Sequence, residues 1–194
     1  MKRDVILAGV GGQGILSIAA AIGLAAVDAG LHLKQAEVHG MSQRGGAVQS
    51  HLRIADHPIA SDLIPLGDCD LILSVEPMES LRYLPYLSAG GSLVTSSHPF
   101  ENIPDYPDLD VLLGEIRKVR NHLIIDAYGL ARKLGSPKVS NMVMLGAAAE
   151  LLGLGMSQLG ASLQVLFGRK GEEVVQLNQD ALRAGMEASR EGGL

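Results

Sequence analysis

Six residues near the start of the chain have the spacing of a turn that can hold an anion. They read Gly9-Val10-Gly11-Gly12-Gln13-Gly14, a G-x-G-x-x-G pattern between two apolar runs. Glycines in such a turn let backbone N–H groups approach a phosphate, and the dipole of the helix that follows favours negative charge. The pattern therefore predicts candidate cofactor-binding residues at Gly9, Gly11, Gly12, Gln13 and Gly14.

This glycine pattern has more than one interpretation. A fold that binds NAD(P) or a flavin places an acid about 20 residues later, and Glu37 follows Gly14 by 23 positions. A crowded strand-to-helix turn needs the same glycines with nothing bound. A P-loop is excluded, because Ile15 stands where that motif has a lysine. The motif alone leaves dinucleotide binding and a purely structural turn open.

A second candidate site is the polar, glycine-containing loop that follows residues 33–38. Arg44 lies there between glycines, an arrangement that can present its guanidinium to a carboxylate or a phosphate. It is the one candidate for a catalytic role; a surface turn in which Arg44 pairs with a neighbouring acid is the alternative. Ser42 is not expected to be an acyl-transfer nucleophile, because no G-x-S-x-G elbow surrounds it. The candidate ligand-binding residues of this segment are Glu37, His39, Ser42, Gln43, Arg44, Gly45 and Gly46.

The composition argues against metal and thiol chemistry by this chain alone. Its single cysteine, Cys69, cannot form an internal disulfide or provide the set of thiolates that an iron–sulfur cluster needs. Asp68 and Asp70 flank this cysteine, and their charges oppose formation of the thiolate. The six histidines are spread along the chain without a close metal-binding pair, so no metal site is expected.

Charge and hydropathy limit the partners of the chain. With a net charge of −5 and no long run of Lys or Arg, its 194 residues offer no basic surface for nucleic acid. The uninterrupted N-terminal apolar run, residues 15–27, is short for a membrane span of about 20 residues. We therefore expect a cytoplasmic protein without an export signal or membrane anchor. The positive mean hydropathy, +0.22, predicts burial against a partner, or a homo-oligomer when the chain is isolated.

The order of apolar runs and glycines predicts one α/β domain over residues 1–194. We expect a Rossmann-like three-layer sandwich, with a mostly parallel sheet, helices on both faces and a helical C-terminal portion. The predicted strands are residues 5–8, 33–38, 47–54, 70–75, 92–96 and 122–126. The predicted helices are residues 15–27, 77–87, 127–134, 141–152, 158–167 and 172–189.

The connections complete this prediction. Residues 89–91 are expected to form a turn, and residues 98–110, which contain three prolines, a loop. The glycine turn and the Arg44 loop should then lie at the carboxyl ends of adjacent strands. Open α/β sheets bind their ligands at that edge.

Four segments together resemble the gamma-type module of the 2-oxoacid:ferredoxin oxidoreductase family. They are the glycine turn at residues 9–14, Glu37-Val-His-Gly-Met-Ser-Gln-Arg-Gly-Gly46, Asp70-Leu-Ile-Leu-Ser-Val-Glu-Pro77 and Asn141-Met-Val-Met-Leu-Gly146. Their order covers residues 4–185, and the second segment is the most specific. Residues 76–84 resemble the form found in small (beta) subunits of the indolepyruvate branch of the family.

The resemblance implies one subunit of an enzyme that decarboxylates an arylpyruvate on thiamine diphosphate, passes electrons through iron–sulfur clusters to ferredoxin and releases an acyl-CoA. Thiamine diphosphate, Mg²⁺ and the clusters are expected on a larger catalytic (alpha) subunit, so this chain alone should be inactive. It would cover the partner's site, with the glycine turn and the Arg44 loop contacting substrate or the phosphates of CoA. A stand-alone NAD(P)- or flavin-binding oxidoreductase and a ligand-free scaffold subunit are the alternatives.

Overall fold

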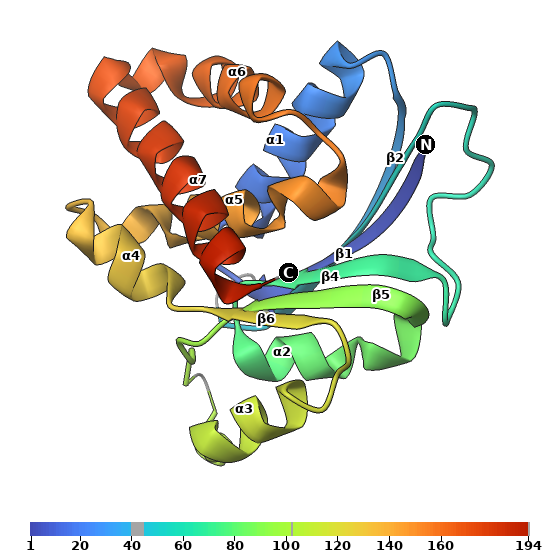
Figure 1. Ribbon diagram of the computed structural model, residues 1–194, viewed down its shortest axis with the longest axis vertical. Helices are drawn as coiled ribbons and strands as arrows, with labels where there is room; N and C mark the ends of the chain where they lie inside the picture. Colours follow the sequence, from blue (N-terminus) through green and yellow to red (C-terminus); the bar gives the residue numbers. More distant parts are fainter. Residues whose placement is uncertain (40–44, 102, 194) are drawn as a thin grey trace.

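The core of the protein is a six-stranded sheet, described by a computed structural model over residues 1–39, 45–101 and 103–193 (Figure 1). Its strands are β1 (Lys2–Val10), β2 (His32–His39), β3 (Ala47–Ala55), β4 (Cys69–Ser74), β5 (Leu87–Ser96) and β6 (His122–Ile125). They lie in the order β2-β3-β1-β4-β5-β6. Each predicted strand is therefore present in the sheet.

Strand β3 runs opposite to the other strands of the sheet. It pairs antiparallel with β1 on one side and with β2 on the other, whereas β1, β4, β5 and β6 form parallel pairs. Residues 40–46 alone connect β2 to β3, and so short a connection has no room for the crossover that parallel neighbours require. The mostly parallel sheet is confirmed. The expectation that the glycine turn and the Arg44 loop follow adjacent strands is wrong, because β3 lies between β1 and β2.

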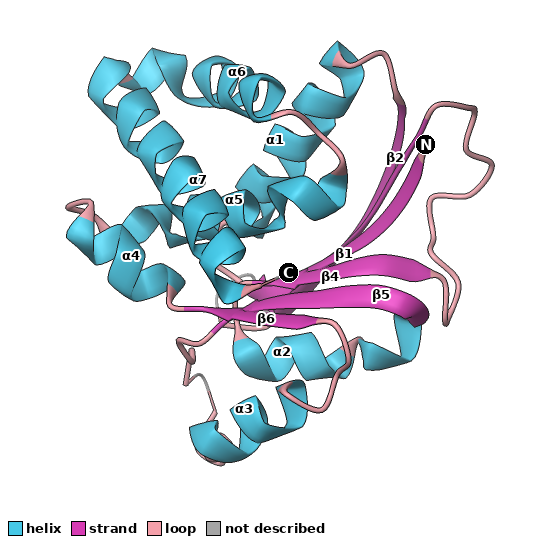
Figure 2. Ribbon diagram, viewed as in Figure 1, coloured by secondary structure: helices cyan, strands magenta, loops and turns pink. Residues whose placement is uncertain are grey.

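Helices cover both faces of the sheet, as predicted (Figure 2). One face carries α1 (Ile15–Asp28), α4 (Ala127–Lys133), α5 (Ser140–Leu152), α6 (Met156–Phe167) and α7 (Glu172–Gly192), and the other carries α2 (Pro77–Arg82) and α3 (Leu109–Ile116). Short 3-10 helices form at Leu84–Tyr86, Pro137–Val139 and Gly168–Lys170. No helix of the described residues is long and apolar enough to cross a membrane.

Strand β1 and helix α5 lie at the centre of the core. Val5 and Leu7 of β1 belong to the apolar cluster shared with α1 and α5, while Ile6 and Ala8 belong to the cluster on the α2 face. Both faces of β1 are covered, so its sequence is a continuous apolar run. Helix α5 is buried from Asn141 through Ala149, because α1, α4 and α7 all pack against it.

The predicted helix at residues 77–87 is too long. It ends at Arg82, and Pro85 explains why, since proline cannot continue a helix and disfavours helical geometry in the residue before it. The predicted turn at residues 89–91 is also wrong, because β5 begins at Leu87 and includes these residues. A Cβ at Gly91 would lie 2.7 Å from the carbonyl oxygen of Cys69, so glycine permits close strand pairing there.

Helix α3 is missing from the prediction. It begins at Leu109, inside the last two residues of the predicted loop. The Asp108 side chain accepts hydrogen bonds from the N–H groups of Asp110, at 2.9 Å, and Val111, at 3.1 Å. An aspartate before an apolar run is a sequence signal for a helix start, and it could have located α3.

Two glycines let α5 and α7 touch backbone to backbone. A Cβ at Gly146 of α5 would lie 1.9 Å from the carbonyl oxygen of Leu182, and a Cβ at Gly185 of α7 would lie 1.9 Å from that of Val143. Two non-bonded heavy atoms cannot come so close unless one of the helices moves. The two helices therefore cross at positions where each has a glycine and no side chain. This crossing fixes the C-terminal helix against the rest of the fold.

We predict that Gly185→Ala lowers the free energy of unfolding by about 1–3 kcal/mol, because the methyl group would force α7 away from α5. Gly160→Ala in α6 is the matched control, since a Cβ there would meet nothing within 4 Å. The control should leave stability unchanged or raise it by about 0.5–1 kcal/mol, because alanine favours a helix more than glycine does. Urea unfolding measures both; equal effects of the two changes would contradict the close crossing.

Candidate functional site

The predicted glycine turn joins the end of β1 to the start of α1. Gly12 and Gly14 have φ values of +102° and +81°, a backbone region that other residues rarely adopt. Gln13 N–H donates to the carbonyl of Val10 at 3.1 Å, which closes the turn. A Cβ at Gly9 would lie 2.4 Å from the Val75 side chain, so three of the motif's glycines serve the tight turn itself.

The Gln13 side chain points back into the protein. Its Oε1 accepts the N–H of Val10 at 2.8 Å, and its Nε2 donates to the carbonyl of Val75 at 3.4 Å. The amide thus connects the end of β1 to the residue that follows β4. Both ends of the amide are used in this bridge, which gives Gln13 a structural role beside its predicted place in a ligand site.

Asn141, at the start of α5, supports the same turn from the other side. Its Nδ2 donates to the carbonyl of Gly14 at 3.2 Å, and its Oδ1 accepts the N–H of Met142 at 3.0 Å. A Cβ at Gly14 would lie 2.4 Å from that Nδ2. Asn141 therefore explains part of the glycine requirement, and it was not among the predicted site residues although the segment that begins with it was noted.

The structure brings part of the second candidate segment onto the glycine turn. Gly11 N–H donates to the carbonyl of Gly46 at 2.8 Å, and Gly45 N–H donates to the carbonyl of Gly11 at 3.3 Å. His39 ends β2. Ser42, Gln43 and Arg44 lie outside the described residues, as does the side chain of His39.

Glu37 lies on β2, which is not the neighbour of the strand that leads into the glycine turn. It pairs with Ser50 of β3, and Ser50 pairs with Leu7 of β1 on its other side. Neighbouring strands are about 4.8 Å apart, so the strand of Glu37 is roughly twice that distance from β1. Its carboxylate accepts a hydrogen bond from Gln35, which also donates to Ser50 at 3.2 Å. The inserted β3 therefore separates Glu37 from the strand next to β1, where NAD-binding folds carry the acid that binds the ribose.

In the part of the chain that the structure describes, hollows lie on several sides of the glycine turn. One of about 310 Å³ lies between the turn, α1 and Val48 of β3. A second, of about 370 Å³, lies on the side of Asn141 and includes the cationic Lys138 and Lys170. The third, of about 270 Å³, includes Gln13, His98 and Tyr128. No sequence pattern pointed to these lysines and rings, because they come from segments that only the fold brings to the turn.

A buried carboxyl group organises the edge of the sheet beside the third hollow. Glu76 follows β4 and is fully buried. It accepts the N–H of Glu79 at 2.8 Å, the N–H of Phe100 at 3.3 Å and the hydroxyl of Tyr106. Burial raises the pKa of Glu76, and these donors partly offset the rise. Glu76 therefore ties the segment after β5 to the start of α2.

The donor set does not fit a metal centre or a cluster. Cys69 is buried, and burial raises the pKa of its thiol to about 12, so it is no reactive thiolate. The described residues contain no group of three His, Cys, Asp or Glu side chains placed to hold a metal ion. Among the described residues, the hollows beside the glycine turn offer a ligand the two lysines and an aromatic wall.

The sequence matches the family model of pyruvate ferredoxin/flavodoxin oxidoreductase over residues 4–188. It is 34% identical over 194 residues to the indolepyruvate oxidoreductase subunit IorB of Archaeoglobus fulgidus, a match that covers 95% of this chain and 94% of that protein. It is 28% identical to the 2-oxoglutarate synthase subunit KorC of Methanothermobacter marburgensis, over 99% of both chains.

Solved structures share the fold. The gamma subunit of a keto/oxoacid ferredoxin oxidoreductase from Geobacter sulfurreducens superimposes with a TM-score of 0.72 at 24% identity, over 97% of this chain and 99% of that one. The 2-oxoglutarate:ferredoxin oxidoreductase of Magnetococcus marinus gives a TM-score of 0.78 at 23% identity, over 98% of this chain and 31% of that one. In the second case the same fold is one part of a longer chain.

We predict that Gln13→Ala lowers the free energy of unfolding by about 1–3 kcal/mol, because it leaves the buried Val10 N–H without its acceptor. Gln176→Ala is the control, since its exposed amide binds the half-buried Asp180 and its loss should cost less than about 0.5 kcal/mol. Thermal and urea unfolding of both variants tests this. Unchanged stability of Gln13→Ala would contradict the structural role.

Proposed function

The chain belongs to the pyruvate ferredoxin/flavodoxin oxidoreductase family, and we propose that it is the small subunit of an indolepyruvate:ferredoxin oxidoreductase. The observation that carries this proposal is the match to the IorB subunit, at 34% identity and over nearly the whole of both chains. The match to a 2-oxoglutarate synthase subunit is weaker, at 28%. An aromatic 2-oxoacid is therefore the substrate that the relatives favour.

Enzymes of this family use thiamine diphosphate and iron–sulfur clusters, and we propose that neither is held here. A single cysteine with a raised pKa cannot ligate a cluster. The described residues also contain no group of three His, Cys, Asp or Glu side chains placed to hold a metal ion. Thiamine diphosphate, Mg²⁺ and the clusters then belong to a larger catalytic (alpha) subunit, and ferredoxin reacts with the assembled complex in the cytoplasm.

The role left for this chain is to complete and cover the partner's site. The glycine turn and the start of β3 lie at one edge of the sheet, joined by the hydrogen bonds of Gly11. Placed against the partner, this edge would exclude water from the reacting centre. Arg44, next to Gly45 in sequence, could then donate to the substrate carboxylate or to CoA phosphates.

A ligand-free scaffold subunit is the second candidate. It is favoured by the hydrogen bonds of Gln13, Asn141 and Gly11, which are all made within the protein. A free-standing NAD(P)- or flavin-binding oxidoreductase is disfavoured, because Glu37 is separated from the turn by β3. The two hypotheses make different predictions for Arg44: a covering subunit needs Arg44 for normal turnover, whereas a ligand-free scaffold does not.

Reconstitution tests the proposed function. This chain and the larger subunit, purified separately and then mixed, should reduce ferredoxin in a reaction that requires both indolepyruvate and CoA. Each subunit alone should be inactive. Equal turnover by the larger subunit without this chain would overturn the proposal, as would reduction of NAD(P)⁺ by this chain alone.

In the reconstituted complex, Arg44→Ala should lower turnover about tenfold or more, equal to about 1.4 kcal/mol of lost transition-state stabilisation. Assembly and stability should change little, by no more than about 0.5 kcal/mol. Arg44→Lys should restore part of the activity, because an ammonium lacks the two-donor fork of a guanidinium. Arg117→Ala, on the exposed end of α3, is the control. Normal turnover with Arg44→Ala would favour the scaffold.

A further inference from the structure

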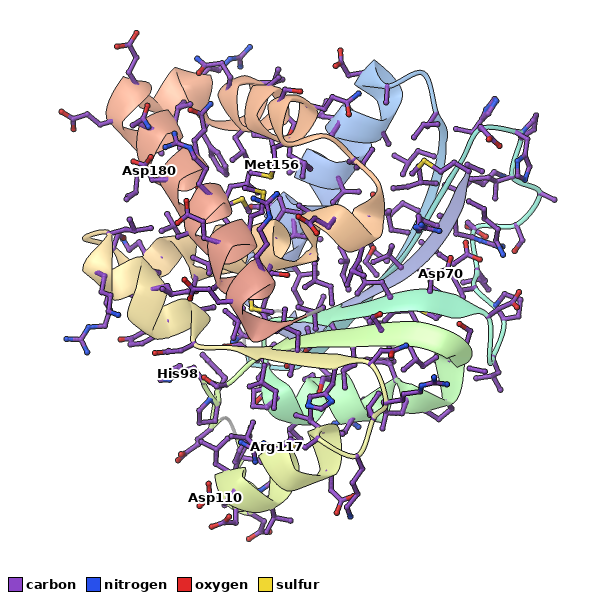
Figure 3. All side chains as sticks on the ribbon, viewed as in Figure 1. Asp70, His98, Asp110, Arg117, Met156 and Asp180 are labelled. Atoms are coloured by element: carbon purple, nitrogen blue, oxygen red, sulfur yellow. The ribbon has the colours of Figure 1, made fainter. Side chains whose placement is uncertain are left out.

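The hollow of about 270 Å³ lies where β4, β5 and β6 end. Val75 follows β4, Ser96 ends β5, and Ala127 begins the helix after β6; all three line it. Figure 3 shows His98 at this edge of the sheet, below α4. The glycine turn contributes Gln13 to the same wall, so this pocket and the turn share one edge.

Three rings and one thioether are among the side chains that line the pocket. The rings of His98 and Tyr128 stack on each other, with centroids 4.2 Å apart and planes 8° from parallel. Phe100, 42% exposed, and the sulfur-bearing Met144, 1% exposed, also line it. Stacked rings and a thioether are the surfaces on which another planar ring binds well.

Two of the polar lining residues, Gln13 and Ser96, already make hydrogen bonds within the protein. Gln13 uses both ends of its amide, toward Val10 and Val75. The Ser96 hydroxyl accepts the N–H of His98 at 3.1 Å. A protein recognises a purine through several hydrogen bonds along the edge of the base. An indole has a single N–H donor, and the Ser140 hydroxyl, which also lines the pocket, can accept that one hydrogen bond. The lining therefore favours an aryl ring over a nucleotide base.

One wall of the pocket belongs to a segment that hydrogen bonds anchor to Glu76. Glu76 binds the backbone N–H of Phe100 and the hydroxyl of Tyr106, which fixes the chain that carries the Phe100 ring. Its volume is just below the range of about 300–1,000 Å³ of pockets for drug-sized ligands. It fits the ring end of a ligand better than a whole cofactor.

We propose that this pocket receives the aromatic ring of an aryl-2-oxoacid, so that this subunit contributes to substrate specificity. The proposal rests on the proposed function, in which this edge of the sheet faces the partner's site. Tyr128 and His98 would be specificity-determining residues that touch the ring. The carboxylate and keto groups, where the chemistry takes place, would remain on the partner.

Kinetics of the reconstituted complex test the pocket. Tyr128→Ala should lower kcat/KM for indolepyruvate about tenfold, equal to about 1.4 kcal/mol, while KM for CoA stays the same. Tyr128→Phe keeps the ring and should behave like the wild type. His98→Ala, on an exposed segment, should also lower kcat/KM for indolepyruvate. This variant provides the test if the Tyr128→Ala subunit does not assemble with its partner.

Ligand binding provides a second test. The chain contains no Trp, so it contributes no indole fluorescence of its own. The fluorescence of indole-3-propionate can therefore be followed without an indole background from this protein. Titration with the full chain should change that emission, Tyr128→Ala should weaken the effect about tenfold, consistent with a lost stacking contact, and AMP should not compete.

Two outcomes would overturn the pocket assignment. A rise in KM for CoA with unchanged indolepyruvate kinetics, or competition by AMP, would show that the pocket takes a nucleotide base. Normal kinetics and binding in both Tyr128→Ala and His98→Ala would show that it takes no ligand ring. Failure of the proposed function would give a different result from failure of the pocket assignment, because the wild-type complex would then not oxidise indolepyruvate at all.

Discussion

Two backbone hydrogen bonds between Gly11 and the two glycines just before β3, Gly45 and Gly46, hold the candidate site together. They join the turn after β1 to the end of the segment that follows β2, so both glycine-rich segments meet at one edge of the sheet. The same pairing requires β3 to lie between β1 and β2, which carries Glu37 away from the turn. One constraint therefore explains why a sequence with a dinucleotide motif has a different site.

The apolar runs predicted every strand and most helices, because burial on both faces of a sheet leaves a strong pattern. Errors arose where one residue overrode that pattern: Pro85 ended α2, and Asp108 started α3 within a proline-rich stretch. The glycines at positions 9–14 were found from spacing alone. Asn141, Lys138, His98 and Tyr128 were not, since only tertiary structure brings them to the turn.

The chemistry of the chain and its family membership point the same way. A family that depends on thiamine diphosphate and clusters needs thiolates and carboxylates, and this chain has one buried thiol with a pKa near 12. What it does have is a sheet edge whose segments are joined by the hydrogen bonds of Glu76 and Gln13. Such an edge is suited to shaping a partner's site.

The distribution of cofactors between the separated subunits tests this account most directly. The complex, purified from its own cell and then dissociated, would be analysed for iron, thiamine and visible absorption in each fraction. The account predicts that all three remain with the larger subunit and that this chain is colourless. Iron, thiamine or a flavin absorption band that stays with this chain would contradict it.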